Sequence, residues 1–202
     1  MAPAGGMMLP PYAKAMKTTF STPRDNATVT ANTLAVNIGA TGYKLSCDWA
    51  GRAPKEDVGH HHLLLDKSLV NMYCTTNASV SHQNVKPGSH TLEVVPALND
   101  HAEVEENASV LHFDYKPSAA LPAITDASPT GAPSIHIVSP KPGATVKGNF
   151  DVVVDIKNST ASCDLYRKPD LTGYGHWHLN FDTSTGGTKV GIVSTELARA
   201  VP

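Results

Sequence analysis

Two short stretches of the chain carry histidines at a spacing that can bind a metal ion. Residues 57–66, DVGHHHLLLD, contain His60, His61 and His62 in succession. Alternate side chains of a strand share a face, so His60 and His62 point one way and His61 points the other way. Neutral imidazoles suit copper, zinc and nickel. Residues 173–182, GYGHWHLNFD, carry a second pair.

Comparison of the two stretches shows that the outer two histidines recur and that the residue between them does not. His176 and His178 repeat the spacing, and Trp177 takes the middle position. Histidine therefore recurs where two residues share a face and is replaced by another aromatic residue where they do not. A fused purification tag would not be duplicated in this pattern, so the sequence argues against a tag.

A metal site needs more than two protein ligands to bind firmly. His90 opens an alternating segment after a Pro-Gly turn, and His101 follows an Asn-Asp turn. A β-sandwich can bring these ends to the first pair. We therefore expect a copper or zinc site in the first stretch, built from His60, His62, His90 and His101.

An aspartate follows each pair by four residues, Asp66 in the first stretch and Asp182 in the second. Either aspartate can orient an imidazole from behind the metal ligands or end the strand. A purely structural role also stays open for the histidines, because imidazoles in adjacent strands hydrogen-bond to carbonyl groups and aspartates.

The sequence does not predict catalysis. Metal-assisted hydrolysis needs fixed ligands, an open position and a general base, and nothing ties any glutamate, Glu103 among them, to the histidine face. The chain has neither a G-x-S-x-G stretch nor a Cys-x-His-x-Met ending of blue-copper type. We therefore expect a protein that is not an enzyme.

The histidine pairs belong to two copies of a longer pattern, which must position them. Residues 21–48 and 138–164 share a P-x-x-x-A-x-V entry, an alternating apolar segment and the triplet Ser-Cys-Asp. The copies are offset by 117 residues at Pro23 and by 116 from Cys47 onward. Such self-similarity indicates a duplicated unit.

Period-two alternation between turn residues predicts short, half-buried strands in both copies. About seven strands over roughly 95 residues are typical of an immunoglobulin-like sandwich. We expect an all-β fold of two tandem immunoglobulin-like β-sandwich domains. The predicted parts are an N-terminal extension (1–17), the first repeat (18–116), a Pro/Ala/Ser/Thr-rich linker (117–134) and the second repeat (135–202).

The second repeat has no counterpart of residues 87–113, so it is expected to be incomplete. Either the sequence is a fragment, or the domain leaves an open edge that a partner strand fills.

Three cysteines are present, Cys47, Cys74 and Cys163. A disulfide between Cys47 and Cys74 would close a loop of about 27 residues and stabilise the fold by about 3 kcal/mol in the chain-entropy model. The offset of 116 places Val190 opposite Cys74, which leaves Cys163 without a local partner.

The formal net charge of -2 gives no basic footprint for nucleic acid. No apolar run approaches the roughly 20 residues of a transmembrane helix. Low charge, the cysteine pair and many Thr, Ser, Asn and Pro residues suit an extracytoplasmic protein that is periplasmic, on the cell surface or secreted.

Three motifs of the first copy carry a family resemblance: Gly59–His62 with Asp66, Pro87–Leu92, and Asn99–His101. The second copy has only the first motif, at Gly175–His178 with Asp182. The motifs resemble G-H-[HW]-H, P-G-x-H-T-[LI] and N-D-H of DUF4399-type domains, a group of exported bacterial and archaeal domains. The resemblance implies an exported β-sandwich with a cluster of His60, His62, His90 and His101, and it implies no reaction.

We therefore predict a non-enzymatic extracytoplasmic binding or accessory protein with a histidine-lined copper or zinc site in the first repeat. The alternative is a structural subunit of a cell-surface or membrane-associated assembly in which the histidines stabilise the fold. In both cases we expect other protein subunits as partners, and neither nucleic acid nor a transmembrane segment of its own.

Overall fold

The computed structural model describes residues 9–49, 52–148, 150–165, 168–181, 188–193 and 197–200, with side chains up to residue 179. Regular structure within these ranges consists of β-strands and three 3-10 helices: η1 (Pro11–Ala15), η2 (Cys47–Trp49) and η3 (Glu105–Asn107). The predicted all-β class is confirmed. No helix in the described ranges is long and apolar enough to cross a membrane.

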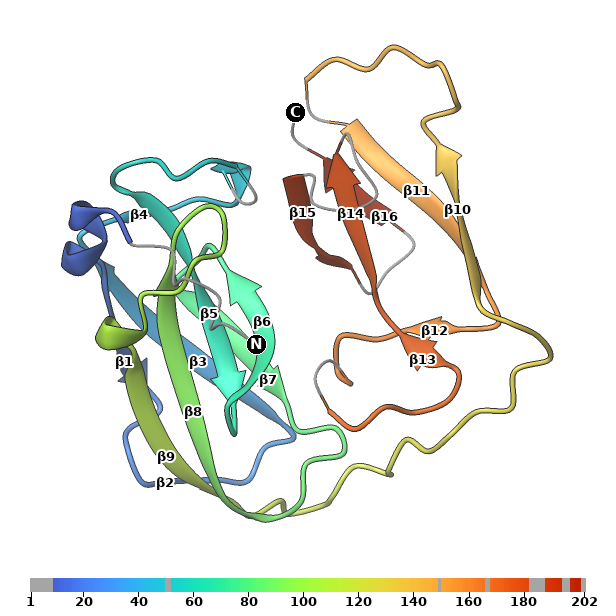
Figure 1. Cartoon of the computed structure of the whole chain (residues 1–202). Helices are drawn as coiled ribbons and strands as arrows, with labels where there is room; N and C mark the ends of the chain where they lie inside the picture. Colours follow the sequence, from blue (N-terminus) through green and yellow to red (C-terminus); the bar gives the residue numbers. More distant parts are fainter. Residues whose placement is uncertain are drawn as a thin grey trace, which may run out of the picture.

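The described part of residues 17–115 forms two facing sheets (Figure 1). One sheet has the strand order β1-β3-β7, and the other has the order β2-β9-β8-β5-β4, with β6 paired to β5. The strands are β1 (Lys17–Thr22), β2 (Ala27–Val29), β3 (Thr33–Thr41), β4 (Lys44–Leu45), β5 (Val58–Leu65), β6 (Ser68–Tyr73), β7 (Asn77–Ser81), β8 (Gly88–Ala97) and β9 (Ser109–Tyr115).

The inner faces of these two sheets share one apolar core. Strand β3 alternates between buried and more exposed residues and contributes Val36 and Ile38. The opposite sheet contributes Leu63, Leu92 and Phe113. Burial of each such side chain is worth about 1.5–3 kcal/mol, so this core supports the β5–β8 pair on which the first histidines lie.

Residues 134–200 form a second group of strands in their described part: β10 (Ser134–Ser139), β11 (Phe150–Lys157), β12 (Thr160–Ala161), β13 (Tyr174–Gly175), β14 (Trp177–Phe181), β15 (Thr188–Val193) and β16 (Leu197–Ala200). They pair as β10-β11-β16, β12-β13 and β14-β15. The core among the described side chains is small: Val152 and Val154 are buried, and Trp177 and Leu179 pack on them.

The strand pairing of the second group repeats that of the first. Lys17 pairs with Thr41 at the start of β1–β3, and Ser134 pairs with Lys157 at the start of β10–β11, with a register shift at the equivalent place in both ladders. The parallel β12–β13 pair repeats β4–β5, and the β14–β15 hairpin repeats β5–β6. Two different sequences therefore adopt one local arrangement.

Strands β2, β8 and β9 have no counterpart in the described part of the second group. Val29 of β2 is 7% exposed, whereas Val146 at the corresponding position is 41% exposed. A Cβ added to Gly59 would lie 2.5 Å from the carbonyl oxygen of Ala97 in β8, whereas the nearest atom to one added to Gly175 is a serine hydroxyl at 3.6 Å. The side that β8 covers in the first group is therefore open at Gly175.

The segment between β9 and β10, residues 116–133, contains no strand. Side-chain amides of the first sandwich, on Asn32, Gln83 and Asn84, donate hydrogen bonds to its carbonyl oxygens. Lys168 of the second group in turn donates to the carbonyl oxygen of Gln83. The three amide bonds hold the segment along the first sandwich, and the lysine bond joins the second group to that sandwich.

The predicted disulfide between Cys47 and Cys74 is present, with Cα atoms 5.3 Å apart. It joins η2, which precedes β5, to the residue that follows β6. The disulfide therefore links the chain on both sides of the strand that carries the first histidine pair.

Cys163 is not in a disulfide, and strand pairing shows why. A uniform offset places Val190 opposite Cys74. In the structure, the β5–β6 ladder ends at the residue before Cys74, and the β14–β15 ladder ends at Val193. The sequence equivalent of Cys74 is therefore the residue after Val193, which is Ser194. The second copy therefore has no cysteine at the position that would pair with Cys163.

Candidate metal centre

The first histidine pair lies in the middle of a sheet, on the strand β5. Main-chain pairing with β8 on one edge and β6 on the other holds this strand in place. His60 and His62 point away from the apolar core and are 1% and 4% exposed, respectively. Their Nε2 atoms lie 3.1 Å apart.

The residue between them points to the opposite face, as strand alternation requires. His61 is fully buried, and its ring centroid lies 6.4 Å from that of Tyr73. Burial lowers the pKa of His61 to about 4, so this ring is neutral at physiological pH. We assign His61 to the packing of the sandwich interior.

A third imidazole comes from the loop that follows β8. The backbone N–H of His101 donates to the carbonyl of Leu98, and the N–H of Leu98 donates to the carbonyl of Ala102, so the loop forms a tight turn with His101 at φ +70°. Leu98 also packs in a small apolar cluster with Met16 and Tyr43. This support places Nδ1 of His101 3.0 Å from Nε2 of His60.

These three residues form a compact group of nitrogen donors. The ligand atoms of His60, His62 and His101 all lie within 4.8 Å of one another. An imidazole nitrogen binds zinc at about 2.0–2.1 Å, so two nitrogens at neighbouring positions around one ion are about 2.9–3.4 Å apart. The two closest distances in the group, 3.1 Å and 3.0 Å, fall in that range.

Glu103 completes the group from behind. Its carboxylate oxygen Oε1 lies 2.5 Å from Nδ1 of His62, on the far side of the ring from the shared centre. The hydrogen bond from His62 lowers the pKa of Glu103 below its ordinary value. A carboxylate that accepts from the outer nitrogen of a ligating histidine is a recurrent support of metal sites, because it orients the ring and raises its basicity.

One nitrogen of His60 lies against both other rings of the group. A carboxylate only accepts, so His62 donates from Nδ1 and, as a neutral ring, presents a lone pair at Nε2. Nε2 of His60 contacts both other rings, yet a ring nitrogen offers either one proton or one lone pair. Two arrangements satisfy this nitrogen: His60 shares one proton between its two neighbours, or a cation at the centre would accept a lone pair from each ring.

Burial favours the neutral form of the His60 ring. Burial, and then the charges of His62 and His101, lower the pKa of His60 to about 2. Metal ions bind the deprotonated imidazole, and His60 is in that form at any physiological pH.

The structure does not bring His90 to this group, which corrects the predicted ligand set. His90 lies at the start of β8, where its Nδ1 is 2.7 Å from Asp66 and its Nε2 is 2.8 Å from the carbonyl oxygen of Lys86. Antiparallel pairing places the other end of β8 beside the histidines, with Ala97 opposite His60. Both nitrogens of His90 therefore have partners at the far end of the strand.

Asp66 lies at the same far end of the strand and bonds to His90. It forms the β5–β6 turn together with Lys67, with φ angles of 49° and 65°, and accepts a hydrogen bond from the backbone N–H of Thr91. The residue that takes the expected supporting role is Glu103. The spacing N-D-H-x-E was the available signal, because it places a carboxylate two residues after His101 in one short loop.

The second histidine pair has the same geometry in a different setting. Nε2 of His176 and Nε2 of His178 lie 3.0 Å apart, and both side chains are exposed. Asp182, the predicted counterpart of Asp66, lies outside the described residues.

The chain matches no family model, and no curated protein matches it. Fibronectin(III)-like modules of CbhA from Clostridium thermocellum align over 92% of this chain and 78% of their own, with 12% identity and a TM-score of 0.35. The endo-beta-1,4-mannanase from Thermotoga petrophila aligns over 51% of this chain and 20% of its own, with 9% identity and a TM-score of 0.35. Likeness at this level assigns neither a family nor a function, and the resemblance to DUF4399-type domains stays a prediction from motifs.

Proposed function

We propose that this protein is a non-enzymatic, extracytoplasmic binding protein whose first domain holds one copper or zinc ion through His60, His62 and His101. We propose further that it consists of two tandem immunoglobulin-like domains of DUF4399 type. The two facing sheets of the first domain and the repeated strand register of the second support this reading of the fold.

The observation that carries the proposal is the convergence of three imidazole nitrogens with Glu103 behind one of them. Three nitrogen donors match the preferences of copper and zinc. A purely structural cluster would be expected to pair each nitrogen with a distinct donor or acceptor, whereas here one nitrogen of His60 serves two neighbours.

Burial of the group supports a binding role over a catalytic one. Metal-assisted catalysis needs a coordination position that substrate can reach, and two of the three ligands are almost completely covered. The disulfide between Cys47 and Cys74 supports a location in an oxidising compartment, because such bonds persist in exported proteins.

The test is the metal content of the untagged protein after exposure to copper or zinc and removal of excess ion. We expect one tightly held ion per chain by elemental mass spectrometry. His101→Ala is expected to lower the affinity at least tenfold, and the variant should still fold because His101 lies on a loop.

His90→Ala is the matched control, since it removes the same side chain from outside the group. It should leave the bound metal unchanged. A protein that binds neither ion, or an equal loss of metal in both variants, contradicts the proposed site.

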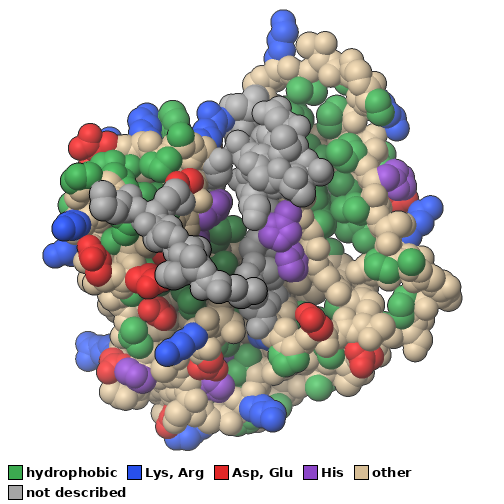
Figure 2. All heavy atoms as spheres, viewed as in Figure 1, with side chains coloured by type: hydrophobic (Ala, Val, Ile, Leu, Met, Phe, Trp, Pro, Cys, Tyr) green, Lys and Arg blue, Asp and Glu red, His purple; other side chains and the backbone are tan. Residues whose placement is uncertain are grey.

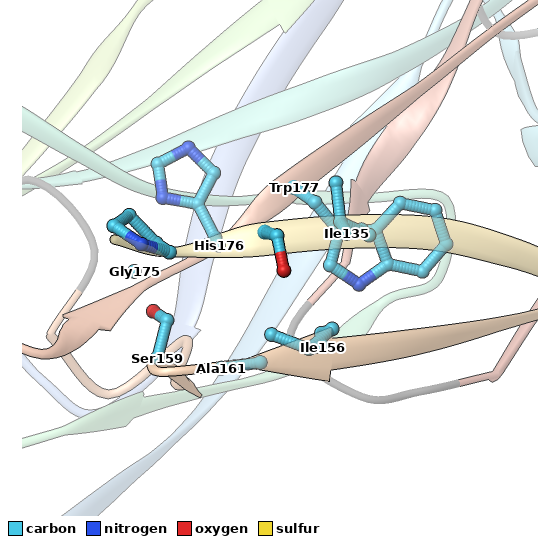
Figure 3. A pocket seen from close by; sticks show the side chains of 9 residues that line it. Ile135, Ile156, Ser159, Ala161, Gly175, His176 and Trp177 are labelled. Carbon is cyan, nitrogen blue, oxygen red and sulfur yellow. The ribbon is translucent and has the colours of Figure 1, made fainter. Parts of the chain in front are cut away.

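A second candidate function is that of a subunit in a cell-surface or envelope assembly with other proteins. The observation that favours it is the open side of the second domain. Ile135 and Ile137 on β10 are 48% and 55% exposed, and hydrophobic side chains gather over β10 and β11 in Figure 2. A pocket of about 240 Å³ lies beside them, lined by Ile135, Ile156 and Trp177 (Figure 3).

Co-purification from the native envelope tests this alternative. The wild-type protein should bring down defined partner subunits, and the Ile135→Glu/Ile137→Glu variant should lose them while keeping its fold and its metal. A monomer that leaves the envelope without partners, with or without these substitutions, rules out the assembly role.

A further inference from the structure

The second histidine pair reproduces the donor geometry of the first pair. The ring centroids of His176 and His178 lie 4.9 Å apart, against 5.0 Å for His60 and His62. The Nε2 atoms are separated by 3.0 Å and 3.1 Å, respectively. Both distances match two imidazoles on neighbouring positions of one ion, which are about 2.9–3.4 Å apart.

Strand pairing holds the backbone on both sides of His176, which itself lies between β13 and β14: Gly175 pairs with Ala161, and Trp177 pairs with Val193. His178 faces Ile192 in the β14–β15 ladder, and His62 faces Met72 at the equivalent place in β5–β6. The register shifts between Leu63 and Leu64 in the first hairpin and between Leu179 and Asn180, the equivalent residues, in the second. The backbone therefore holds His178 as it holds His62, and the paired residues on both sides of His176 keep that histidine beside His178.

The surroundings of the two pairs differ in what covers them. The first pair is closed by β8 and by the loop that carries His101. The second pair is exposed and lines a pocket of about 620 Å³, together with Asp170 and Tyr174. A cation held there keeps coordination positions open to water or to an incoming ligand.

We infer that His176 and His178 form a second, solvent-accessible cation site that binds borderline divalent ions in an exchangeable manner. Imidazole donors bind first-row divalent ions most strongly at Cu2+ in the Irving–Williams order, so Cu2+ is the ion of choice for the pair. Two ligands and open positions make this site weaker and faster to exchange than a closed three-histidine site.

Trp177 provides a local reporter, because it stands between the two histidines and is one of two tryptophans in the chain. On a Trp49→Phe background, Trp177 is the sole tryptophan emitter. Bound Cu2+ quenches a nearby indole, so a Cu2+ titration of this variant should show saturable quenching. Addition of a competing chelator should restore the emission.

His178→Gln and His176→Gln on that background should each shift the quenching midpoint at least tenfold to higher Cu2+. His136→Gln is the matched control: His136 is an exposed histidine of the same domain, next to Asp155. That variant should titrate like its parent. Circular dichroism checks that all variants keep their fold.

Unchanged quenching in both His176→Gln and His178→Gln, or an equal shift in His136→Gln, overturns the inference. His101→Ala separates this site from the proposed centre of the first domain. That variant should retain the Trp177 response whether or not the first domain binds a metal ion, so failure of one site is distinguishable from failure of the other.

Discussion

Glu103 accepts a hydrogen bond from Nδ1 of His62 and thereby directs the other ring nitrogen of His62 at His60. The two residues are 41 positions apart in the chain and come from different elements, β5 and the loop after β8. Their contact orients the ring of His62 toward the group that His101 completes, and it determines which tautomer the neutral ring adopts.

Glu103→Gln tests this relationship. The amide still fills the same space but is a weaker acceptor than the carboxylate, so we expect metal affinity to fall about 10–100-fold. Competition with a chromogenic chelator measures the change. Glu106→Gln, on an exposed glutamate of the same loop, should leave the affinity unaltered; an equal effect from both substitutions would mean that net charge, and not the His62 contact, is responsible.

The disulfide is expected to stabilise the domain that carries the centre. Replacing Cys47 and Cys74 with serine should lower the free energy of unfolding by about 2–4 kcal/mol, as measured by urea denaturation. Cys163→Ser provides the control, because this cysteine forms no disulfide. If the control loses as much stability as the double variant, the loss comes from thiol removal and not from the crosslink.

Acid should weaken the fold through His82. Its ring lies against Tyr115, with centroids 4.1 Å apart, and burial lowers its pKa in the folded state. The unfolded chain has the ordinary value of about 6.5. It therefore binds more protons than the folded state below that pH, so the free energy of unfolding falls as pH drops through this range.

His82→Phe keeps a ring in the core but does not titrate. Between pH 6.5 and pH 5, the free energy of unfolding of this variant should fall less steeply than that of the wild type. The two slopes should differ by up to about 1.4 kcal/mol per pH unit. Urea midpoints at several pH values measure both slopes. Parallel slopes would contradict the assignment, and the exposed His136→Gln should keep the wild-type slope.

Asp66 and His90 should prove structural and separable from the metal. Asp66→Asn retains a residue that tolerates positive φ but loses the charged partner of His90. We expect a loss of about 0.5–1.5 kcal/mol in stability and no change in metal content. A loss of metal without a loss of stability would instead return His90 to the ligand set.

Local pattern predicted a substantial part of this molecule. Alternation along residues 58–65 correctly separates His60 and His62 from His61, because the two faces of a strand are a consequence of backbone geometry. The disulfide was also predictable, since Cys47 precedes and Cys74 follows the hairpin of β5 and β6, whose two strands are adjacent in the sequence. These features depend on short-range geometry, which the order of residues contains.

The choice between His90 and His101 is a different kind of question. His90 lies near the start of β8, and His101 lies four residues past its end. The strand has 10 residues and extends over roughly 30 Å at about 3.3 Å per residue. Only one end can meet His60, and the direction in which β8 pairs with β5 decides which end it is.

By itself, then, the sequence determined the strands, the all-β class, the pair of histidines on one face of a strand, and the recurrence of that pair at His176 and His178. Tertiary structure decided that His101 joins the first pair, that Glu103 contacts His62, and that the first pair is covered whereas the second pair is exposed. The physical reason is that antiparallel registry and the packing of loops over a sheet join residues far apart in the chain, and such contacts leave no local periodicity to read.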